Sequence, residues 1–168
     1  LLVTLAIVLS VLHEARLFFT HVPWLDFLFG THWSPQSATH ATPDALGLMF
    51  GAVPLLVGTF LITAIALLLA VPVGLMSAIY LAEYATPTVR RWLKPTLELL
   101  AGIPTVVYGY FAVVTVAPFL RYAGAWLGVP VAAESALVAG LVMGIMIIPF
   151  ISSLSDDMIT AVPRGLRD

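Results

Sequence analysis

Long apolar runs, separated by short groups of charged residues, dominate the chain. No charged residue occurs within residues 45–82, 99–120 or 135–155. A helix that spans a membrane needs about 20 apolar residues, and a charged side chain at its centre costs about 2.5–3.5 kcal/mol. The pattern therefore predicts three complete spans, the first of which covers residues 58–82 because Pro54 indicates that a connecting segment ends near it.

A further apolar run, residues 1–13, opens the chain and ends at Glu14. It is too short to span a membrane, and it has no basic start or cleavage pattern typical of a signal peptide. Because the chain opens within this run without Met and stops at Asp168 without a closing element, we expect a fragment that begins at the end of a longer helix. The predicted fold is an all-α, polytopic transmembrane helix bundle with four visible crossings.

The composition agrees with a membrane protein. The chain is 61% hydrophobic and 10% charged, whereas soluble domains carry about 25% charged residues. A net charge of −2 without a basic patch gives no indication of nucleic-acid binding. Cysteine is absent, which excludes a disulfide framework and thiol chemistry.

The basic residues predict the orientation, because Lys and Arg in short loops favour the cytoplasmic side. Five of them fall on one side of the predicted spans, and two fall on the other. The first group is Arg90, Arg91, Lys94, Arg164 and Arg167, and the second is Arg16 and Arg121. We therefore expect the loop around Lys94 to be cytoplasmic and the region near Ala125 to be external.

The external connection, residues 17–50, begins with closely spaced aromatic residues interrupted by His21, Pro23 and Asp26. Such a pattern is typical of an amphipathic segment at the membrane interface, where aromatic rings accumulate. Residues 31–44 are polar and rich in turn-forming residues. Residues 1–50 are thus predicted to hold the end of the first helix and this external segment, and residues 51–168 to begin a transmembrane domain.

The motifs of several enzyme classes are missing from the sequence. A P-loop needs Gly-Lys-Ser/Thr, but Lys94 is the single lysine and is followed by Pro95, so ATP is not bound in that way. A zinc-protease HExxH begins at His13 but has Leu17 in place of its second histidine. The irregular spacing of the external histidines favours ordinary loop residues over a metal site, and no cofactor or metal is expected.

Glycine and proline recur in all three predicted spans. The pairs are Pro72 and Gly74, Gly102 and Pro104, and Gly144 and Pro149. Small residues allow close helix packing, whereas a broken helix at membrane depth is tolerated where it lines a cavity or is buried in protein. Because three adjacent spans share the pattern, we expect interrupted helices, which favours a transporter or channel over an enzyme.

The third span has the strongest break signal, Gly102-Ile103-Pro104. Proline removes a helix hydrogen bond and clashes with the preceding turn. We expect this segment to bend or open the span where it faces other helices, so that Thr105 and Tyr108 offer hydroxyl groups. Farther along, residues 152–168 are polar, and Pro163 is predicted to be the first residue of a short cytoplasmic helix; the alternative is an ordinary loop.

Three segments resemble one family. They are GTFLITAIALLLAVPVGLMSAIYLAEYA (58–85), LELLAGIPTVVYGY (97–110) and IMIIPFISSLSDDMITAVPRGLRD (145–168). Together they resemble the permease subunit, of the C type, of the bacterial phosphate ABC importer. The first is common to many type I ABC permeases, whereas the second is characteristic of the phosphate permeases. FLFGTHWSP (27–35) also resembles the external segment of the C-type subunit.

The resemblance implies a multi-pass subunit of the bacterial inner membrane that works by alternating access. Its implied partners are a second permease, two cytoplasmic ATP-binding subunits and an extracytoplasmic phosphate-binding protein, and ATP hydrolysis belongs to the ATP-binding subunits. It also implies that the last two of six spans lie beyond the chain. From the Gly and Pro pattern of the spans, we expect the translocation path to include Gly102, Pro104, Thr105, Tyr108 and Pro149. The segment that couples to the ATPase would include Pro163, Arg164, Leu166, Arg167 and Asp168, where Asp168 stands at a position usually held by Glu.

Alternative functions remain open on the residues alone. A permease of the same fold could carry molybdate or an amino acid, and only the resemblance of residues 99–109 argues for phosphate. An ion-coupled secondary transporter would need ionisable residues inside its spans, and the predicted spans contain none. An intramembrane enzyme is disfavoured by the missing motifs.

Overall fold

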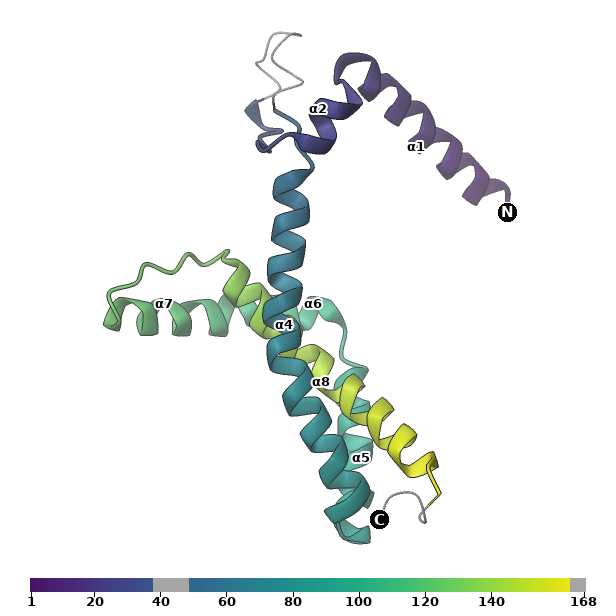
Figure 1. Cartoon of the computed structure of the whole chain (residues 1–168), viewed down its shortest axis with the longest axis vertical. Coiled ribbons are helices and arrows are strands. Elements are labelled where there is room, and N and C mark those ends of the chain that lie inside the picture. The colour runs from purple at the N-terminus through teal and green to yellow at the C-terminus, as the bar shows by residue number, and fades with distance from the viewer. Residues whose placement is uncertain (38–48, 164–168) are drawn as a thin grey trace. The chain divides into compact units, whose positions relative to one another are not determined.

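Helices make up most of the computed structural model, which describes residues 1–37 and 49–163 (Figure 1). Its described part confirms the all-α prediction, with four helices long and apolar enough to cross a membrane. The chain divides into two compact units, residues 1–59 and 60–168. Each unit is described by itself below.

The first unit is organised around aromatic side chains. Helix α1 (Leu2–His21) and the short helix α2 (Trp24–Phe29) are joined by a turn in which Val22 is buried. Five rings pack edge to face, at centroid distances of 5.2–5.9 Å, which is a favoured geometry for aromatic pairs. They belong to Phe18, Phe19, Phe27, Trp33 and Phe50.

Helix α1 differs from the prediction, because it does not end near residue 13. It continues through Glu14 and Arg16 and contains 20 residues. Both charged side chains are exposed, so neither has to be buried against the aromatic cluster. A charge near the end of an apolar run therefore failed to mark the end of the helix.

Helix α4 (Val53–Ile79) begins one residue before Pro54, which fits the favourable position of proline in a first turn. It continues into one π-helical turn, η2 (Tyr80–Tyr84), which the hydrogen bond from the Ala85 N–H to the Tyr80 carbonyl closes at 2.8 Å. The resulting span, Val53–Tyr84, is longer than the predicted 58–82.

Helix α5 (Pro87–Ala101) starts with a Thr86 N-cap, whose hydroxyl accepts a hydrogen bond from the Val89 N–H, and with proline as its first residue. Its polar and apolar residues lie on different faces, as expected for a helix outside the bilayer core. The prediction placed residues 99–101 in the third span, but they form the last turn of α5.

The third membrane-spanning helix has three parts: α6 (Thr105–Phe111), the π-helical turn η3 (Ala112–Val116) and α7 (Ala117–Trp126). The wider turn η3 ends two residues before Pro118, the second residue of α7. Proline clashes with the carbonyl four residues earlier, and a π-helical turn accommodates such a misfit without breaking the helix. The span therefore covers Thr105–Trp126 instead of residues 99–120.

Helix α8 (Ala136–Ala161) begins at a Ser135 N-cap, whose hydroxyl accepts from the Val138 N–H at 3.4 Å. It passes through Pro149 and ends six residues beyond the predicted limit of 155. Residues 156–161, the part of the polar segment predicted to lie beyond the span, are thus its last turns. Pro163 follows α8 and lies outside any described helix.

Small residues bring α4 and α8 into close contact in the second unit, where the two helices cross in Figure 1. A Cβ atom at Gly140 would lie 2.7 Å from the Ile65 Cβ, and one at Gly74 would lie 2.8 Å from a methyl group of Ile151. Contacts progress in the same order along both helices, so α4 and α8 run parallel. Two membrane-spanning helices run in the same direction when one further crossing lies between them, and the segment from α6 to α7 is that crossing.

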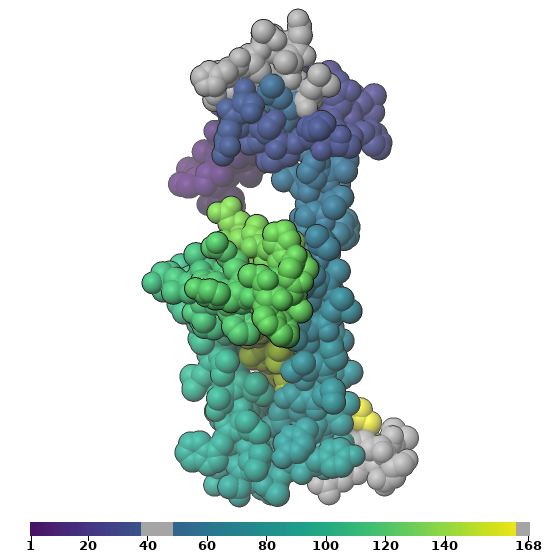
Figure 2. All heavy atoms as spheres, turned by 90° about the vertical axis from the view of Figure 1, so that its left-hand side faces the viewer, coloured from purple at the N-terminus to yellow at the C-terminus, as the bar shows by residue number. Residues whose placement is uncertain are grey.

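Away from this contact the helices expose apolar side chains. Phe60, Leu68 and Phe150, for example, are 72%, 77% and 63% exposed. Figure 2 shows α7 and the segment after it, in green, projecting toward the viewer in front of α4. Since apolar surface of this extent is unfavourable in water, it suits lipid or further helices.

Candidate functional site: an ionic cluster and a helix break

The break expected at Gly102-Ile103-Pro104 is present, but it separates two helices instead of bending one. Gly102 caps α5, and its N–H donates to the carbonyls of Glu98 at 3.2 Å and Leu99 at 3.1 Å. Pro104 is the N-cap of α6, with φ −56° and ψ 137°. The expectation of a bend within the span is therefore wrong, because Pro104 lies at the start of the span.

The two hydroxyl groups expected beside the break have different surroundings. Thr105 is the first residue of α6 and is exposed. The Tyr108 hydroxyl donates a hydrogen bond of 3.1 Å to the Leu100 carbonyl in the last turn of α5. Tyr108 therefore ties α6 to α5 across the break, and its hydroxyl hydrogen is not directed at a passing solute.

The other two Gly/Pro pairs do not interrupt their helices, contrary to the prediction. Pro72 lies inside the continuous helix α4, and Pro149 is buried inside α8. Gly74 and Gly144 lie at the contact between these helices, where a Cβ at Gly144 would come within 3.0 Å of the Ala66 carbonyl. Close packing explains both glycines.

Of the predicted coupling segment, Pro163 alone is described; it is exposed and follows the end of α8. Arg164, Leu166, Arg167 and Asp168 lie outside the described residues. The role of this segment stays a prediction.

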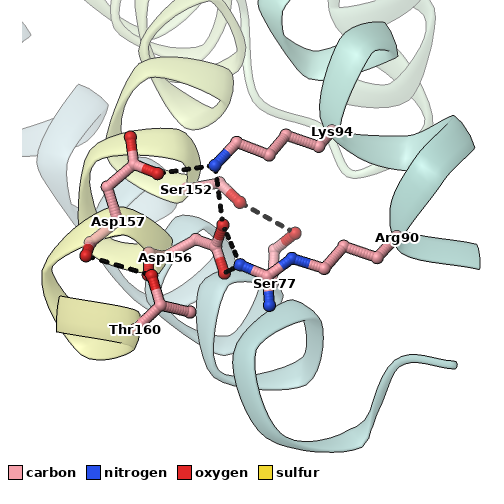
Figure 3. Close-up of polar contacts among 7 residues, drawn as sticks. All are labelled: Ser77, Arg90, Lys94, Ser152, Asp156, Asp157 and Thr160. Carbon is pink, nitrogen blue, oxygen red and sulfur yellow. Dashed lines mark hydrogen bonds and ion pairs between the residues drawn. The ribbon is translucent and has the colours of Figure 1, made fainter. Parts of the chain in front are cut away.

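A cluster of four charged side chains joins α5 to the last turns of α8 (Figure 3). At its centre is Asp156, which is 2% exposed. The Arg90 Nη2 donates to both carboxylate oxygens of Asp156, at 2.8 and 2.9 Å. The Lys94 Nζ donates to Asp156 Oδ2 at 3.2 Å and to Asp157 Oδ1 at 2.5 Å. We call these four residues the ionic cluster.

Helical spacing places the members of the ionic cluster together. Arg90 and Lys94 are four residues apart on α5, so both lie on one face of that helix. Asp156 and Asp157 are neighbours on α8 and differ in exposure, at 2% and 57% of their side chains. Asp156 thus points toward α5, whereas Asp157 contacts Lys94 from the exposed side of the contact between α5 and α8.

The ionic cluster is balanced, with two cationic and two anionic side chains. A buried charge is costly unless it is paired and hydrogen-bonded, and in the described structure no buried side-chain nitrogen or oxygen lacks a hydrogen-bond partner. The hydrogen bond to Asp157 raises the pKa of Lys94, against a smaller opposite effect of burial. A raised pKa means that this stabilisation is fully present at neutral pH and is lost only as the pH rises through the raised value.

One more polar contact lies beside the ionic cluster and connects α8 to α4 (Figure 3). The Ser152 hydroxyl, which is fully buried, donates to the Ser77 Oγ at 3.1 Å. Ser152 and Asp156 are one helical turn apart, so the same stretch of α8 contacts both α4 and α5. In the described part of the chain no group of three His, Cys, Asp or Glu side chains is arranged to hold a metal ion.

The ionic cluster was not predicted, because the charges of Asp156 and Asp157 indicated only the end of the span. Two signals were available. Arg90 and Lys94 have the spacing of one helix face, and the predicted topology places them on the same side of the membrane as the two aspartates. Opposite charges on one side of adjacent spans are candidates for pairing.

The fold defines the class of the protein: an all-α, multi-pass membrane protein. Comparisons with curated proteins point to ABC transporter permeases. The chain is 32% identical over 145 residues to the probable ABC transporter permease protein YqgH of Bacillus subtilis, covering 86% of this chain and 43% of that protein. It is 33% identical over 160 residues to the phosphate transport system permease protein PstC 1 of Mycobacterium tuberculosis, covering 83% and 47%.

A third relative, the phosphate transport system permease protein PstC of Mesorhizobium japonicum, is 32% identical over 159 residues, covering 85% of this chain and 45% of its own length. These similarities confirm the resemblance to phosphate permeases of the C type. The chain spans about half the length of the curated relatives it matches. No family model and no solved structure matches the chain.

Proposed function

We propose that this chain is part of a transmembrane permease subunit of an ATP-driven importer of inorganic phosphate, in the bacterial inner membrane. The observation that carries the proposal is the similarity of 83–86% of the chain to permeases that include several named for phosphate transport. The four apolar helices supply the expected membrane-spanning scaffold.

The partners in this proposal are a second permease, two cytoplasmic ATP-binding subunits and an extracytoplasmic phosphate-binding protein. The subunit is a transporter component, and ATP hydrolysis takes place in its partners. The segment from Pro163 to Asp168 would receive their movement, since it directly follows α8. The importer would then alternate between outward-open and inward-open arrangements of its helices.

The proposed path includes Gly102, Pro104, Thr105, Tyr108 and Pro149. Helices α4, α6 and α8 contain no Lys or Arg, and the third span contains Arg121 alone, five residues before its end. Few cations along the helices favour weak, transient contact with an anion, so selectivity would rest mainly on the phosphate-binding protein.

Phosphate uptake tests the proposed function. The full-length protein that carries this chain, produced with its partner subunits in a bacterial strain lacking its own phosphate permease, should restore uptake of radiolabelled phosphate. A matched control replaces the partner ATPase with an inactive form and should abolish uptake. Uptake of molybdate or an amino acid without phosphate would instead support a permease of the same fold for another solute.

Single cysteines test the proposed orientation, because the chain contains no cysteine. Arg91→Cys in α5 and Ala125→Cys in α7 both replace exposed side chains. We expect an impermeant thiol reagent added outside intact cells to label the cysteine at 125 and to leave that at 91 unlabelled until the membrane is opened. The opposite pattern would reverse the topology.

A further inference from the structure

We propose that Asp156 is a positioning residue for transport: through Arg90 and Lys94 it clamps α8 to α5, so that the two helices move together when α8 is displaced. This inference rests on the proposed function and deepens it. In this proposal the ionic cluster transfers movement from the C-terminal end of α8 to the break between α5 and α6 at residues 102–104.

The first step is the place of the ionic cluster on α8. Asp156 lies five residues before the end of α8 and seven before Pro163, where the proposed coupling segment begins. A helix rises about 1.5 Å per residue, so Asp156 is roughly one and a half turns from the point at which α8 would be pushed or pulled. Movement of that end reaches Asp156 within a continuous helix.

The second step is the contact itself. Arg90 bonds both oxygens of Asp156, and Lys94 bridges Asp156 to Asp157. Asp156 is 2% exposed in the packed structure, so its carboxylate takes its side-chain hydrogen bonds from Arg90 and Lys94. Loss of a partner while the carboxylate stays buried is strongly unfavourable. A shift of α8 is therefore expected to carry α5 with it.

The third step leads from α5 to the break. Lys94 lies eight residues before Gly102 on the same helix, and the Leu100 carbonyl accepts the hydrogen bond from Tyr108 of α6. The series of contacts is thus continuous from α8, through α5, to the first turns of the third span. The break lies where a movement of α5 would change the direction of α6.

A double-mutant cycle separates this role from simple charge balance. Asp156→Asn leaves the cluster with one excess positive charge, and Arg90→Gln leaves it with one excess negative charge. The double variant restores neutrality, because Lys94 and Asp157 remain as a pair, but it lacks the contact between Arg90 and Asp156. Arg91→Gln is the matched control, since Arg91 is the exposed neighbour of Arg90 on α5 and is not a member of the ionic cluster.

The measurements are membrane abundance and the amount of phosphate imported per ATP hydrolysed, in the complete complex. We expect each single variant to lower abundance and the double variant to recover it. The ratio of phosphate to ATP should fall at least about fivefold in Asp156→Asn and should stay low in the double variant, within the range typical of mutations that disturb coupling. Arg91→Gln should keep a ratio within about twofold of the parent, because it removes an exposed charge outside the ionic cluster.

Recovery of both abundance and the phosphate-to-ATP ratio in the double variant would overturn the proposal, because the cluster would then serve charge balance alone. A normal ratio in Asp156→Asn would also overturn it. Folding is checked independently by a Ser77→Cys/Ser152→Cys pair in each background, since these hydroxyls lie 3.1 Å apart and their disulfide reports the contact of α4 and α8. Absence of phosphate uptake in the parent complex would reject the proposed function itself.

Discussion

Replacing Gly140 with leucine is expected to lower the membrane abundance of the protein at least about fivefold. Gly140 lies where α8 meets α4, and even a Cβ atom there would come within 2.7 Å of two atoms of the Ile65 side chain and 3.1 Å of the Ile62 carbonyl. The Ile62 carbonyl belongs to the helix backbone and cannot move aside alone. Overpacking of a close contact costs about 1–3 kcal/mol, and 1 kcal/mol corresponds to about a fivefold change in an equilibrium.

The matched control is Gly58→Leu, also in a membrane-spanning helix. A Cβ atom at Gly58 has no neighbour within 4 Å, so the same increase in side-chain volume meets no described obstacle. Abundance is measured by immunoblotting of membranes, and the Ser77→Cys/Ser152→Cys disulfide reports the helix contact directly. Equal abundance and equal disulfide yield in the two glycine variants would show that the contact of α4 and α8 does not stabilise the protein.

The membrane-spanning architecture could be predicted from the sequence because its cause is local. Residues 58–82 and 135–155 are free of charge over a span's length, and lipid penalises charge strongly. Pro104 was a valid break signal for the same reason: its missing N–H and its ring act on the adjacent turn. The structure confirms that the chain is broken there, and it shifts the start of the span to Thr105.

The end of α8 could not be predicted in the same way, because it depends on residues distant in the sequence. Asp156 and Arg90 are 66 positions apart, and Asp156 and Lys94 are 62 apart. Asp156 and Asp157 pair with Arg90 and Lys94, and both aspartates lie within α8, so the helix does not end at these charges. Pro149 was predicted to interrupt its helix, but it is buried within the continuous helix α8. Pro72 also lies inside a continuous helix, α4, and is exposed, so packing between α4 and α8 does not account for it.

Pro104→Leu, at the N-cap of α6, is expected to have the second large effect. It should lower phosphate uptake at least about tenfold while the protein remains in the membrane. Proline inside a helix costs about 3 kcal/mol or more. Its replacement therefore favours a continuous helix from α5 into α6 by about a hundredfold relative to the present break. Such a helix would remove the turn that the Tyr108 hydrogen bond now closes and would redirect α6.

Gly109→Ala is the matched control for Pro104→Leu, because it changes the same helix, α6, and leaves the break in place. A Cβ atom added at Gly109 would have no neighbour within 4 Å. We therefore expect the uptake of this variant to stay near that of the parent. Tyr108→Phe, which removes only the hydroxyl, should have an intermediate effect, since one neutral hydrogen bond contributes about 0.5–1.5 kcal/mol. Uptake and membrane abundance are measured together, and undiminished uptake by Pro104→Leu at normal abundance would exclude a role of the break in transport.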